Sequence, residues 1–568
     1  MPPLPAAHAN VGLAAEADAG SNGDGDAVAA AATATAAAAA AAAAPPPSSS
    51  SWASSRVPSR PCAFTQMSRH KQAARTLLGP THPLFLDLSI GSSDLRPHQA
   101  VLEALRDAAL NDPDAHAYGL RPSTLPFLRA ATDWFAREFG GEAHARSAAQ
   151  AAAAEGGGGG SGVQEQPAPP PPPPPPLRSL DVDREALALI GAQEGLAHLL
   201  LAVCEPREDA VLLSDVAYPP YASACDVASV EARTYGLKAA AVGGGAGGLL
   251  PDLDALDAQL QREKEAERRP RVLLINMPQN PTGAVPSYRF WRRALDFCDR
   301  WDLLLVSDNP YAALVFPEEE QEGGATGGQQ ATARPSLAAA RAMGFLPQDA
   351  LPDTLTAPGA LAYALYENRG REQRVVELFS LSKSHLMGGM RLGFALGSRS
   401  AVAALEAVKA PVDFNQWRGL LKAGEVALRL PASESTWVAA REYGRRARAL
   451  AEALRREARW DVAAEDGRAL PPPVAAMYVW ARLPRGWRRA RRAGAAGGGN
   501  NNNNNDDDDD DDDAAFCRDL VVATGVAVAP GSGFGEGGRG RVRFALVAPA
   551  PDLQRAAAAV GAFLRGEV

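Results

Sequence analysis

The residues with the clearest chemical potential lie in a short run that contains a lysine. Lys383 ends the sequence Ser-Leu-Ser-Lys that begins at Ser380, and Arg391 comes eight residues after the lysine. An uncharged lysine amine can condense with an aldehyde, and a serine hydroxyl together with an arginine can hold a phosphate group. The run therefore favours a ligand that carries both an aldehyde and a phosphate.

Two motifs upstream of this run supply groups for an aromatic nitrogen ring. Asn280 begins Asn-Pro-Thr-Gly and can hydrogen-bond a ring hydroxyl, whereas Asp308 begins Asp-Asn-Pro-Tyr and can pair with a ring nitrogen. Tyr311 ends the second motif, and its hydroxyl can donate to the same ring oxygen as Asn280. A pyridine ring accepts electrons best when its nitrogen is protonated, and a neighbouring carboxylate holds that proton. The three motifs in this order predict a site for pyridoxal 5'-phosphate (PLP).

A phosphate group also needs backbone N–H donors, which the start of a helix provides. Ala192 and Gln193 follow Gly191 at the start of a helical pattern, so their amides can point at the anion. Tyr218 lies in Ala-Tyr-Pro-Pro-Tyr, and its ring can lie on the face of the cofactor. A core tyrosine at a turn is the alternative interpretation of Tyr218. We expect no metal ion in this site.

Short apolar runs that alternate with helical patterns must position these residues. The runs that we predict to be strands are 186–190, 210–213, 272–275, 303–306 and 375–379. Strands that alternate with helices favour an α/β fold, with a mostly parallel sheet and helices on both faces. Ligands bind such sheets where the carboxyl ends of the strands meet their loops. The candidate residues follow several of these runs directly, as that rule requires.

The chain is longer than its globular part. After residue 396, long amphipathic helices precede short strands, which predicts a smaller α+β domain joined by the strand 86–90. Segments dominated by Ala, Gly, Pro, Asn or Asp cannot bury enough apolar surface to fold, so we expect disordered insertions there. The predicted parts are a disordered or targeting region at 1–63, an N-terminal arm and part of the small domain at 64–100, a large domain at 101–396 with a disordered insertion at about 145–176, and a small C-terminal domain at 397–568 with a disordered insertion at about 494–515. The large domain also has a variable insertion at about 318–372.

Composition excludes some classes of partner. The formal charge is −9, and the aspartate run 506–513 accounts for all but one of these charges. We find no basic stripe with interleaved aromatic residues, so we expect no nucleic-acid partner. The alanine-rich stretch 27–44 is too weakly hydrophobic to be a good membrane span, and we expect no membrane partner. Five scattered cysteines without a CxxC pair fit a reducing compartment. The Ser-rich stretch 48–60 leaves plastid and cytoplasmic locations both open.

Together the motifs resemble those of class I/II aminotransferases in the fold-type I PLP-dependent superfamily. The resemblance extends from about residue 85 to residue 396 and continues in the C-terminal domain. It implies a large PLP-binding domain with a sheet of the seven-stranded type. The segments LSIGSSDL (88–95) and VDFNQW (412–417) are similar to cyanobacterial members, and the chain as a whole resembles aspartate-type, LL-diaminopimelate and succinyldiaminopimelate aminotransferases of bacteria and plastids.

The same resemblance implies further roles. Tyr118 would reach the phosphate of the neighbouring subunit, which implies a homodimer with shared active sites. Arg543, in Arg-Val-Arg-Phe, corresponds to the arginine that clamps the substrate α-carboxylate with two hydrogen bonds. Gly91 corresponds to the glycine beside that carboxylate, and Asn280 joins Gly91 and Arg543 in substrate binding. A simple structural role for Arg543 on a surface strand is the alternative.

The sequence therefore predicts an aminotransferase that moves an amino group between an amino acid and a 2-oxo acid by a ping-pong cycle in amino acid biosynthesis. Lys383, Asp308 and Tyr218 are its candidate catalytic residues. The alternative is another enzyme of the superfamily, such as a carbon–sulfur lyase or an aminocyclopropane-carboxylate synthase-like enzyme, because these share the same cofactor-binding residues. A binding or regulatory protein that keeps the fold is a third hypothesis, which a failure to bind PLP would favour.

Overall fold

The computed structural model describes residues 56–57, 63–79, 85–153, 177–242, 245–263, 267–317, 356–460, 464–465, 468–469, 473–484, 487 and 513–568. Most of the region 1–63 and most of the predicted insertions lie outside these residues. The two domains that position the candidate site lie within them.

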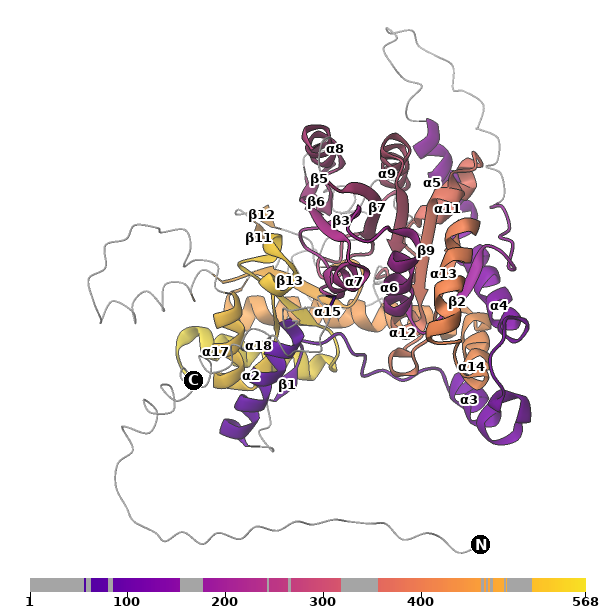
Figure 1. The fold of residues 1–568 in the computed structure, drawn as a ribbon. Helices are drawn as coiled ribbons and strands as arrows, with labels where there is room; N and C mark the ends of the chain where they lie inside the picture. The colour runs from indigo at the N-terminus through magenta and orange to yellow at the C-terminus, as the bar shows by residue number, and fades with distance from the viewer. Residues whose placement is uncertain are drawn as a thin grey trace, which may run out of the picture. The chain divides into compact units, whose positions relative to one another are not determined.

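A seven-stranded sheet forms the centre of the large domain (Figure 1). In spatial order its strands are β2 (Ala186–Leu189), β10 (Gly393–Gly397), β9 (Val375–Ser380), β8 (Leu304–Asp308), β7 (Arg269–Asn276), β3 (Asp209–Ser214) and β4 (Glu231–Tyr235). Strand β10 is antiparallel to both of its neighbours, whereas every pair from β9 to β4 is parallel. The prediction of an α/β fold with a mostly parallel seven-stranded sheet is confirmed.

Helices cover both faces of this sheet because its strands are apolar on both sides. In β7, Val272 and Leu274 belong to one hydrophobic core, and Leu273 and Ile275 belong to the other. Helices that contribute to the first core are α6 (Ala192–Val203), α7 (Pro220–Ala228) and α13 (Arg399–Val412). Helices that contribute to the second are α3 (Gln99–Asn111), α4 (Arg121–Phe139), α5 (Glu142–Ala153), α8 (Leu253–Arg262), α9 (Tyr288–Trp301), α11 (Ala360–Glu367) and α14 (Arg418–Arg429).

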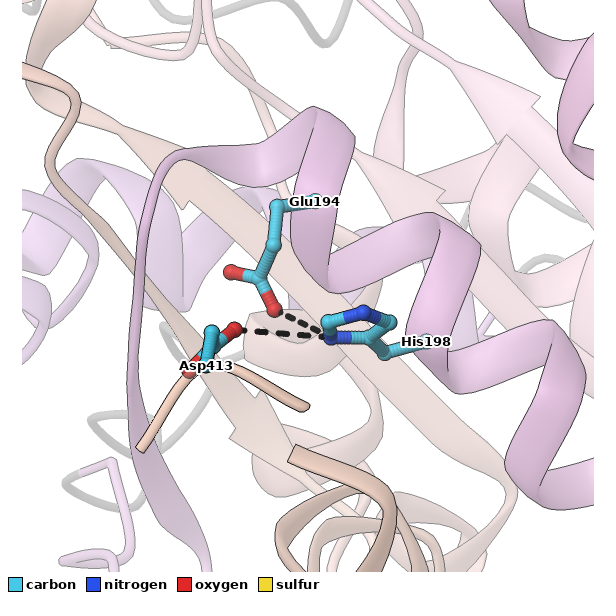
Figure 2. Close-up of side chains that lie close together, drawn as sticks. All are labelled: Glu194, His198 and Asp413. Carbon is cyan, nitrogen blue, oxygen red and sulfur yellow. Dashed lines mark ion pairs between the residues drawn. The ribbon is translucent and has the colours of Figure 1, made fainter. Parts of the chain in front are cut away.

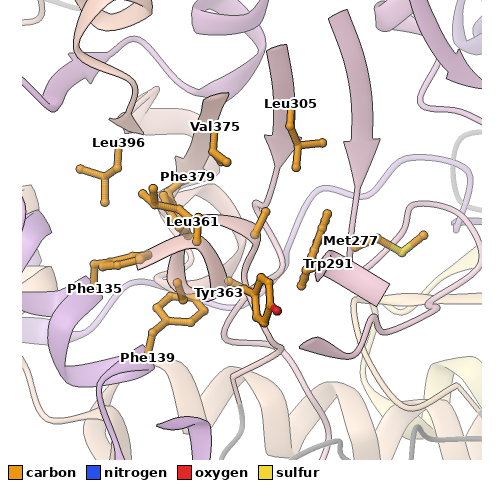
Figure 3. Packing of buried hydrophobic residues seen from close by; sticks show 14 of the residues in the cluster. Phe135, Phe139, Met277, Trp291, Leu305, Leu361, Tyr363, Val375, Phe379 and Leu396 are labelled. Carbon is orange, nitrogen blue, oxygen red and sulfur yellow. The ribbon is translucent and has the colours of Figure 1, made fainter. Parts of the chain in front are cut away.

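Aromatic packing in the second core fixes the strand that leads to the candidate lysine. Figure 3 shows part of this core. The ring of Phe379 lies 5.9 Å from that of Phe135 and 6.2 Å from that of Phe139, measured between centroids. The indole N–H of Trp291 donates to the carbonyl of Pro358 at 2.7 Å. The aromatic pairs that Phe379 forms each contribute about 0.5–1.5 kcal/mol beyond burial, and they stabilise the end of β9.

Parts of the predicted insertions are helical. Helix α5 extends through 145–153 of the predicted insertion 145–176, and its Ala145 and Ala148 are buried in the second core. Helix α11 lies within the predicted insertion 318–372, and residues 360–366 are all buried. A helix that is apolar on every side belongs inside a protein, and α11 packs beside β9 accordingly. The remaining predicted insertion residues lie mostly outside the described chain.

Helices α13 and α14 follow the predicted domain boundary at residue 397 but pack on the large domain. Leu405 of α13 belongs to the core formed with α6, and Leu421 of α14 belongs to the core formed with α4. Both helices therefore pack on the large-domain sheet. Their amphipathic pattern predicts a buried face without indicating which domain buries it, and the packing favours a boundary near residue 430.

The small domain is an α+β unit that includes the N-terminal arm. Its helices are α2 (Ala63–Leu78), α15 (Thr436–Ala458), α17 (Asp513–Thr524) and α18 (Ala550–Arg565). Its strands are β13 (Tyr478–Arg482), β16 (Arg541–Ala545) and β15 (Ala529–Pro530) in one antiparallel sheet, and β1 (Leu86–Asp87) parallel to β14 (Val526–Ala527). Leu88 accepts a hydrogen bond from the Ala545 amide at 2.8 Å and donates one to Ala527 at 2.8 Å. The N-terminal arm thus pairs with strands of this α+β unit.

Four further strands form two antiparallel pairs, β5 (Leu237–Val242) with β6 (Gly245–Pro251) and β11 (Ala464–Glu465) with β12 (Arg468–Ala469). None of the described helices is both long enough and apolar enough to cross a membrane.

Candidate active site

The candidate residues gather at the carboxyl ends of the central strands. Asp308 is the last residue of β8, and Ser380 is the last residue of β9. Strand β9 leads directly into the short helix α12 (Leu381–Ser384), which contains Lys383. Asn276, at the end of β7, pairs in register with Asp308, and its amide nitrogen donates to the Asp308 carbonyl at 2.8 Å. The parallel register thus brings three loops to the same edge, where ligands of such sheets bind.

Asp308 is buried and only partly satisfied. One carboxylate oxygen, Oδ2, accepts a hydrogen bond from the Tyr221 hydroxyl. The other oxygen, Oδ1, is buried without a hydrogen-bond partner among the described residues. Burial raises the pKa of Asp308 to about 6, against the hydrogen bond from Tyr221, which lowers it. A positively charged group beside Oδ1 would favour the ionised carboxylate.

Lys383 contacts the N-terminal arm of the small domain. Its ammonium nitrogen, Nζ, donates to the carbonyl oxygen of Gly91. Ser380 begins α12 as its N-cap, and its hydroxyl accepts from the Ser382 amide at 3.2 Å. The cap fixes the helical turn that carries the lysine, since an N-cap side chain satisfies an amide that the helix leaves without a partner.

A second group of residues forms a cradle suited to an anion. Gly191 has φ +89°, and a Cβ atom there would lie 2.8 Å from Nη2 of Arg391. Arg391 also donates from Nη1 to the Gly388 carbonyl at 3.0 Å and to the Ser382 hydroxyl at 3.5 Å. Helix α6 begins at Ala192, and no side chain of the described residues caps its N-terminus. A guanidinium and the first amides of a helix therefore lie together, which is an arrangement that binds phosphate.

Tyr218 lies next to this cradle. Its hydroxyl donates to Oε1 of Gln193, the second residue of α6, at 3.1 Å. Its ring meets that of Tyr221 edge-on, at 5.6 Å between centroids. The predicted residues Tyr218 and Gln193 are thus in contact, and Tyr221 connects them to Asp308.

Arg543 is fully buried where the two domains meet. Its Nη1 donates to Oδ1 of Asn280 at 2.8 Å, and its Nη2 donates to the carbonyl of Ser89 at 2.7 Å. The guanidinium carbon lies 4.2 Å from the ring centroid of Tyr478 and 4.7 Å from that of Phe534. Burial lowers the pKa of the Arg543 guanidinium, since it disfavours the charged form. The surface-strand alternative for Arg543 does not fit this position.

Tyr311 reaches a residue that the sequence analysis did not single out. The hydroxyl groups of Tyr311 and Tyr478 lie 2.8 Å apart and share a hydrogen bond. Burial raises the pKa of Tyr311 well above its ordinary value. Only the prediction of short strands after residue 396 pointed toward Tyr478, and Tyr221 was noted only as part of the motif around Tyr218. Contacts across the fold, rather than a local pattern, give both residues their positions.

Tyr118 is not brought to the other candidate residues of its own chain. Its side chain is 80% exposed, and its ring meets that of Phe414 edge-on at 5.2 Å. Arg418 donates from Nε to the Tyr118 carbonyl at 2.9 Å, and Asn415 donates to the Gly119 carbonyl at 3.0 Å. The segment after α13 thus holds the loop that presents Tyr118 to solvent.

A group of charged residues connects α6 to the end of α13. Figure 2 shows Glu194, His198 and Asp413 around a common point, and Nδ1 of His198 lies 2.6 Å from Glu194 and 3.6 Å from Asp413. The buried ammonium of Lys409 lies 3.3 Å from Glu194 and 2.8 Å from Asp413. Glu194 also accepts from the Ile190 amide at 2.7 Å, just before the cradle. We interpret the group as an ion-pair network, because Lys409 supplies the positive charge that the carboxylates require.

The described residues fit PLP on three structural grounds. A buried oxygen of Asp308 has no hydrogen-bond partner among the described residues, which suits a cationic ring nitrogen. A Cβ atom at Gly191 would crowd the Arg391 guanidinium, so the backbone there can approach an anion only as glycine. Lys383 lies at the end of the neighbouring strand, as a covalent attachment point requires. The three positions correspond to the ring nitrogen, the phosphate and the aldehyde.

Comparisons with known proteins identify the family of the chain. The sequence model of the family described as aminotransferase class I and II matches residues 176–560. A probable N-succinyldiaminopimelate aminotransferase from Thermus thermophilus is 37% identical in sequence, with a TM-score of 0.61 over 88% of this chain and 99% of that one. The LL-diaminopimelate aminotransferase of Aquifex aeolicus (strain VF5) is 26% identical over 72% of this chain and 79% of its own length. That of Desulforudis audaxviator (strain MP104C) is 27% identical over 83% and 88%.

Fold and site define an α/β enzyme of the fold-type I class. The chain belongs to the class I and II aminotransferase family, and it is an aminotransferase that acts on amino acids and 2-oxo acids.

The raised pKa of Asp308 has a measurable consequence for stability. The folded protein holds this proton up to about pH 6, whereas the unfolded chain releases it near its ordinary pKa of 3.8. The contribution of Asp308 to stability is therefore greatest below about pH 4 and falls as the pH rises to about 6. The quantity to compare is the free energy of unfolding of the cofactor-free wild-type protein minus that of Asp308→Asn. We expect this difference to fall by up to about 3 kcal/mol between about pH 4 and about pH 6.

Urea titrations of both proteins from pH 4 to pH 6.5 measure this difference. Added PLP should abolish the fall, because a cationic ring nitrogen favours the ionised carboxylate. A difference that is constant with pH in the cofactor-free protein would contradict the burial argument.

Proposed function

We propose that this chain is a PLP-dependent aminotransferase of the diaminopimelate type, which moves an amino group between a diaminopimelate-like amino acid and a 2-oxo acid by a ping-pong cycle. The observation that carries the proposal is that each domain contributes one cation that hydrogen-bonds to the other domain. Arg543 of the small domain reaches Asn280, and Lys383 of the large domain reaches Gly91. One cation is suited to a substrate carboxylate, and the other to an aldehyde.

PLP supplies an aldehyde that links to an amine and a ring that takes up electrons from the substrate. Asp308 would hold the proton on the ring nitrogen, supported by Tyr221. Asn280 and Tyr311 would hydrogen-bond the ring oxygen. The first amides of α6, at Ala192 and Gln193, would bind the phosphate together with Ser380 and Arg391, and Tyr218 would lie against the ring.

Lys383 and Arg543 would divide the work on the substrate. Arg543 would bind the α-carboxylate with its two Nη groups and so fix the orientation of the Cα–H bond beside the ring. Lys383, once released from the cofactor, would take the proton from the substrate Cα and would deliver it to C4′, the cofactor carbon of the aldehyde. The hydrogen bonds of Arg543 to Asn280 and Ser89 support this division, because they hold the guanidinium before substrate binds.

The names of the relatives support the substrate class. The similar proteins are named LL-diaminopimelate and N-succinyldiaminopimelate aminotransferases. We therefore propose amino donors with a long side chain that ends in a second polar or charged group. An aspartate-type donor is the nearest alternative within the same chemistry.

The first test uses PLP-loaded protein and a panel of amino acids that includes LL-diaminopimelate, N-succinyl-LL-diaminopimelate and aspartate. The preferred donor should convert the visible absorbance of lysine-linked PLP to that of the pyridoxamine form. Lys383→Ala should lose at least about 100-fold in turnover, as expected for a missing general base. Lys238→Ala, whose side chain is 60% exposed and pairs with Asp252 beside the β5–β6 pair, is the control with unchanged turnover.

Two outcomes would contradict the proposal. Full turnover in Lys383→Ala would remove the assigned base. Release of ammonia and a 2-oxo acid from a single amino acid, without an acceptor, would instead establish the lyase alternative.

We further propose that the enzyme is a homodimer in which Tyr118 completes the neighbouring site. Exposed apolar side chains gather where the Tyr118 loop meets the segment after α13, namely Tyr118, Leu120, Val412, Phe414 and Trp417. Contiguous exposed apolar residues of this kind indicate an interface. Arg418 holds the backbone of Tyr118, and the tyrosine side chain is exposed, so its hydroxyl is available to another subunit.

The second test combines two variants in one dimer. Tyr118→Phe keeps the apolar ring, so it should remain dimeric while its affinity for PLP falls about tenfold, the loss expected for a hydrogen bond to a charged group. In hybrids with Lys383→Ala, the Lys383-containing site receives an intact Tyr118 from the other subunit and should regain the wild-type PLP dissociation constant. A hybrid site that retains the weak affinity would place Tyr118 in its own subunit's site.

A further inference from the structure

Tyr478 occupies the centre of the group formed by three predicted site residues. Its ring lies 4.2 Å from the guanidinium carbon of Arg543, and its hydroxyl lies 2.8 Å from that of Tyr311. A Cβ atom added to Gly91 would collide with the Tyr478 ring and hydroxyl. Tyr478 is 2% exposed, and it is not itself among the residues to which a role has been assigned above.

The strands of the small domain hold Tyr478 in this position. It begins β13, which pairs antiparallel with β16, and its backbone is in register with Ala545, two residues beyond Arg543. Successive side chains on a strand point to opposite faces, so Arg543 and Ala545 lie on the same face of β16. Residues diagonal to one another across two strands are within reach of aromatic and long side chains. The ring of Tyr478 therefore extends over the guanidinium from the neighbouring strand.

We propose that Tyr478 is a positioning residue for both halves of the active site. Its ring holds the guanidinium of Arg543 in the plane that receives the substrate α-carboxylate, and its hydroxyl directs the hydroxyl of Tyr311 toward the cofactor ring oxygen. The inference rests on the proposed function and names a residue that serves it.

The first half of this role is electrostatic and steric. Arg543 lies between the rings of Tyr478 and Phe534, and a cation over an aromatic face is attracted by the ring quadrupole. Its two Nη groups already donate to Asn280 and Ser89, which fixes the ends of the guanidinium. The Tyr478 ring packs against the face of the guanidinium. Without that ring the guanidinium would gain freedom that carboxylate binding must then remove.

The second half concerns one shared hydrogen bond. If the Tyr478 hydroxyl donates to the Tyr311 oxygen, the Tyr311 proton is free to point at the ring oxygen of the cofactor. A hydrogen-bond donor at the ring oxygen stabilises the negative charge on that oxygen. The oxygen then stabilises less well the protonated nitrogen that links Lys383 to PLP. The bond should therefore lower the pH midpoint of the visible absorbance of bound PLP.

Two substitutions at one position separate the two roles. Tyr478→Phe keeps the ring and loses the hydroxyl, so KM for the best amino donor should stay within about twofold of wild type, while the absorbance midpoint rises by several tenths of a pH unit. Tyr478→Leu loses both, so KM should rise about tenfold with a smaller change in kcat, in line with the strength of a desolvated cation–π contact. The midpoint should rise in this variant as well.

Tyr443→Phe is the matched control. Its hydroxyl is buried in the same small-domain core and bonds to the Ser93 hydroxyl at 2.7 Å, so the substitution removes a comparable buried bond. It should lower the melting temperature without moving KM or the absorbance midpoint.

Three results would overturn the proposal. The first is an unchanged absorbance midpoint in Tyr478→Phe, and the second is a KM in Tyr478→Leu no higher than in Tyr478→Phe. The third is an equal shift of the absorbance midpoint in Tyr443→Phe, which would mean that the shift in Tyr478→Phe comes from a general loosening of the small domain. Each leaves the proposed function intact, because that function is tested separately by the absorbance change of wild-type protein with an amino donor and by the turnover of Lys383→Ala. Should Tyr478→Leu fail to fold, the Tyr478→Phe midpoint alone decides the hydroxyl role.

Discussion

The burial of one carboxylate is the constraint on which the whole site depends. Asp308 ends the middle strand of the sheet, with one oxygen bonded to Tyr221 and the other buried without a partner among the described residues. An ionised carboxylate in such surroundings is costly unless a positive charge compensates it. The position therefore favours a ligand with a cationic nitrogen, and the strands on either side bring the remaining groups to the same edge of the sheet.

Ion pairs in the small domain position the backbone that meets Lys383. Gly91, whose carbonyl accepts from the lysine, lies in the N-terminal arm between two anchored aspartates. Asp87 pairs with Lys71 at 2.7 Å, and Asp94 accepts from both Nη groups of the buried Arg446 at 2.6 and 2.9 Å. Charged groups that are held in this way keep a loop rigid, because breaking a partly buried pair leaves a charge uncompensated. The substrate side of the site is thus built by the small domain and presented to the large one.

The sequence was sufficient for five of the seven strands of the sheet, since apolar runs that end in polar motifs mark strand ends. Strands β4 and β10 were not among the predicted runs. Asp308 and Lys383 were predictable for this reason. The contact between Arg543 and Asn280 joins residues 263 positions apart, so only the family resemblance indicated it. Tyr478 carried no local signal, because its position depends on how β13 pairs with β16. Helix α11 was missed because it lies in the segment 318–372 predicted as a variable insertion, although its apolar residues on every side are typical of a buried helix.

The central claim is that one amine of this chain bonds covalently to PLP at the edge of the sheet. Reduction of the PLP-loaded protein with borohydride, followed by peptide mapping, tests that claim most directly. The account predicts one phosphopyridoxyl adduct, on the peptide that contains Lys383. An adduct on another lysine, or none on a protein that still transfers amino groups, would contradict it.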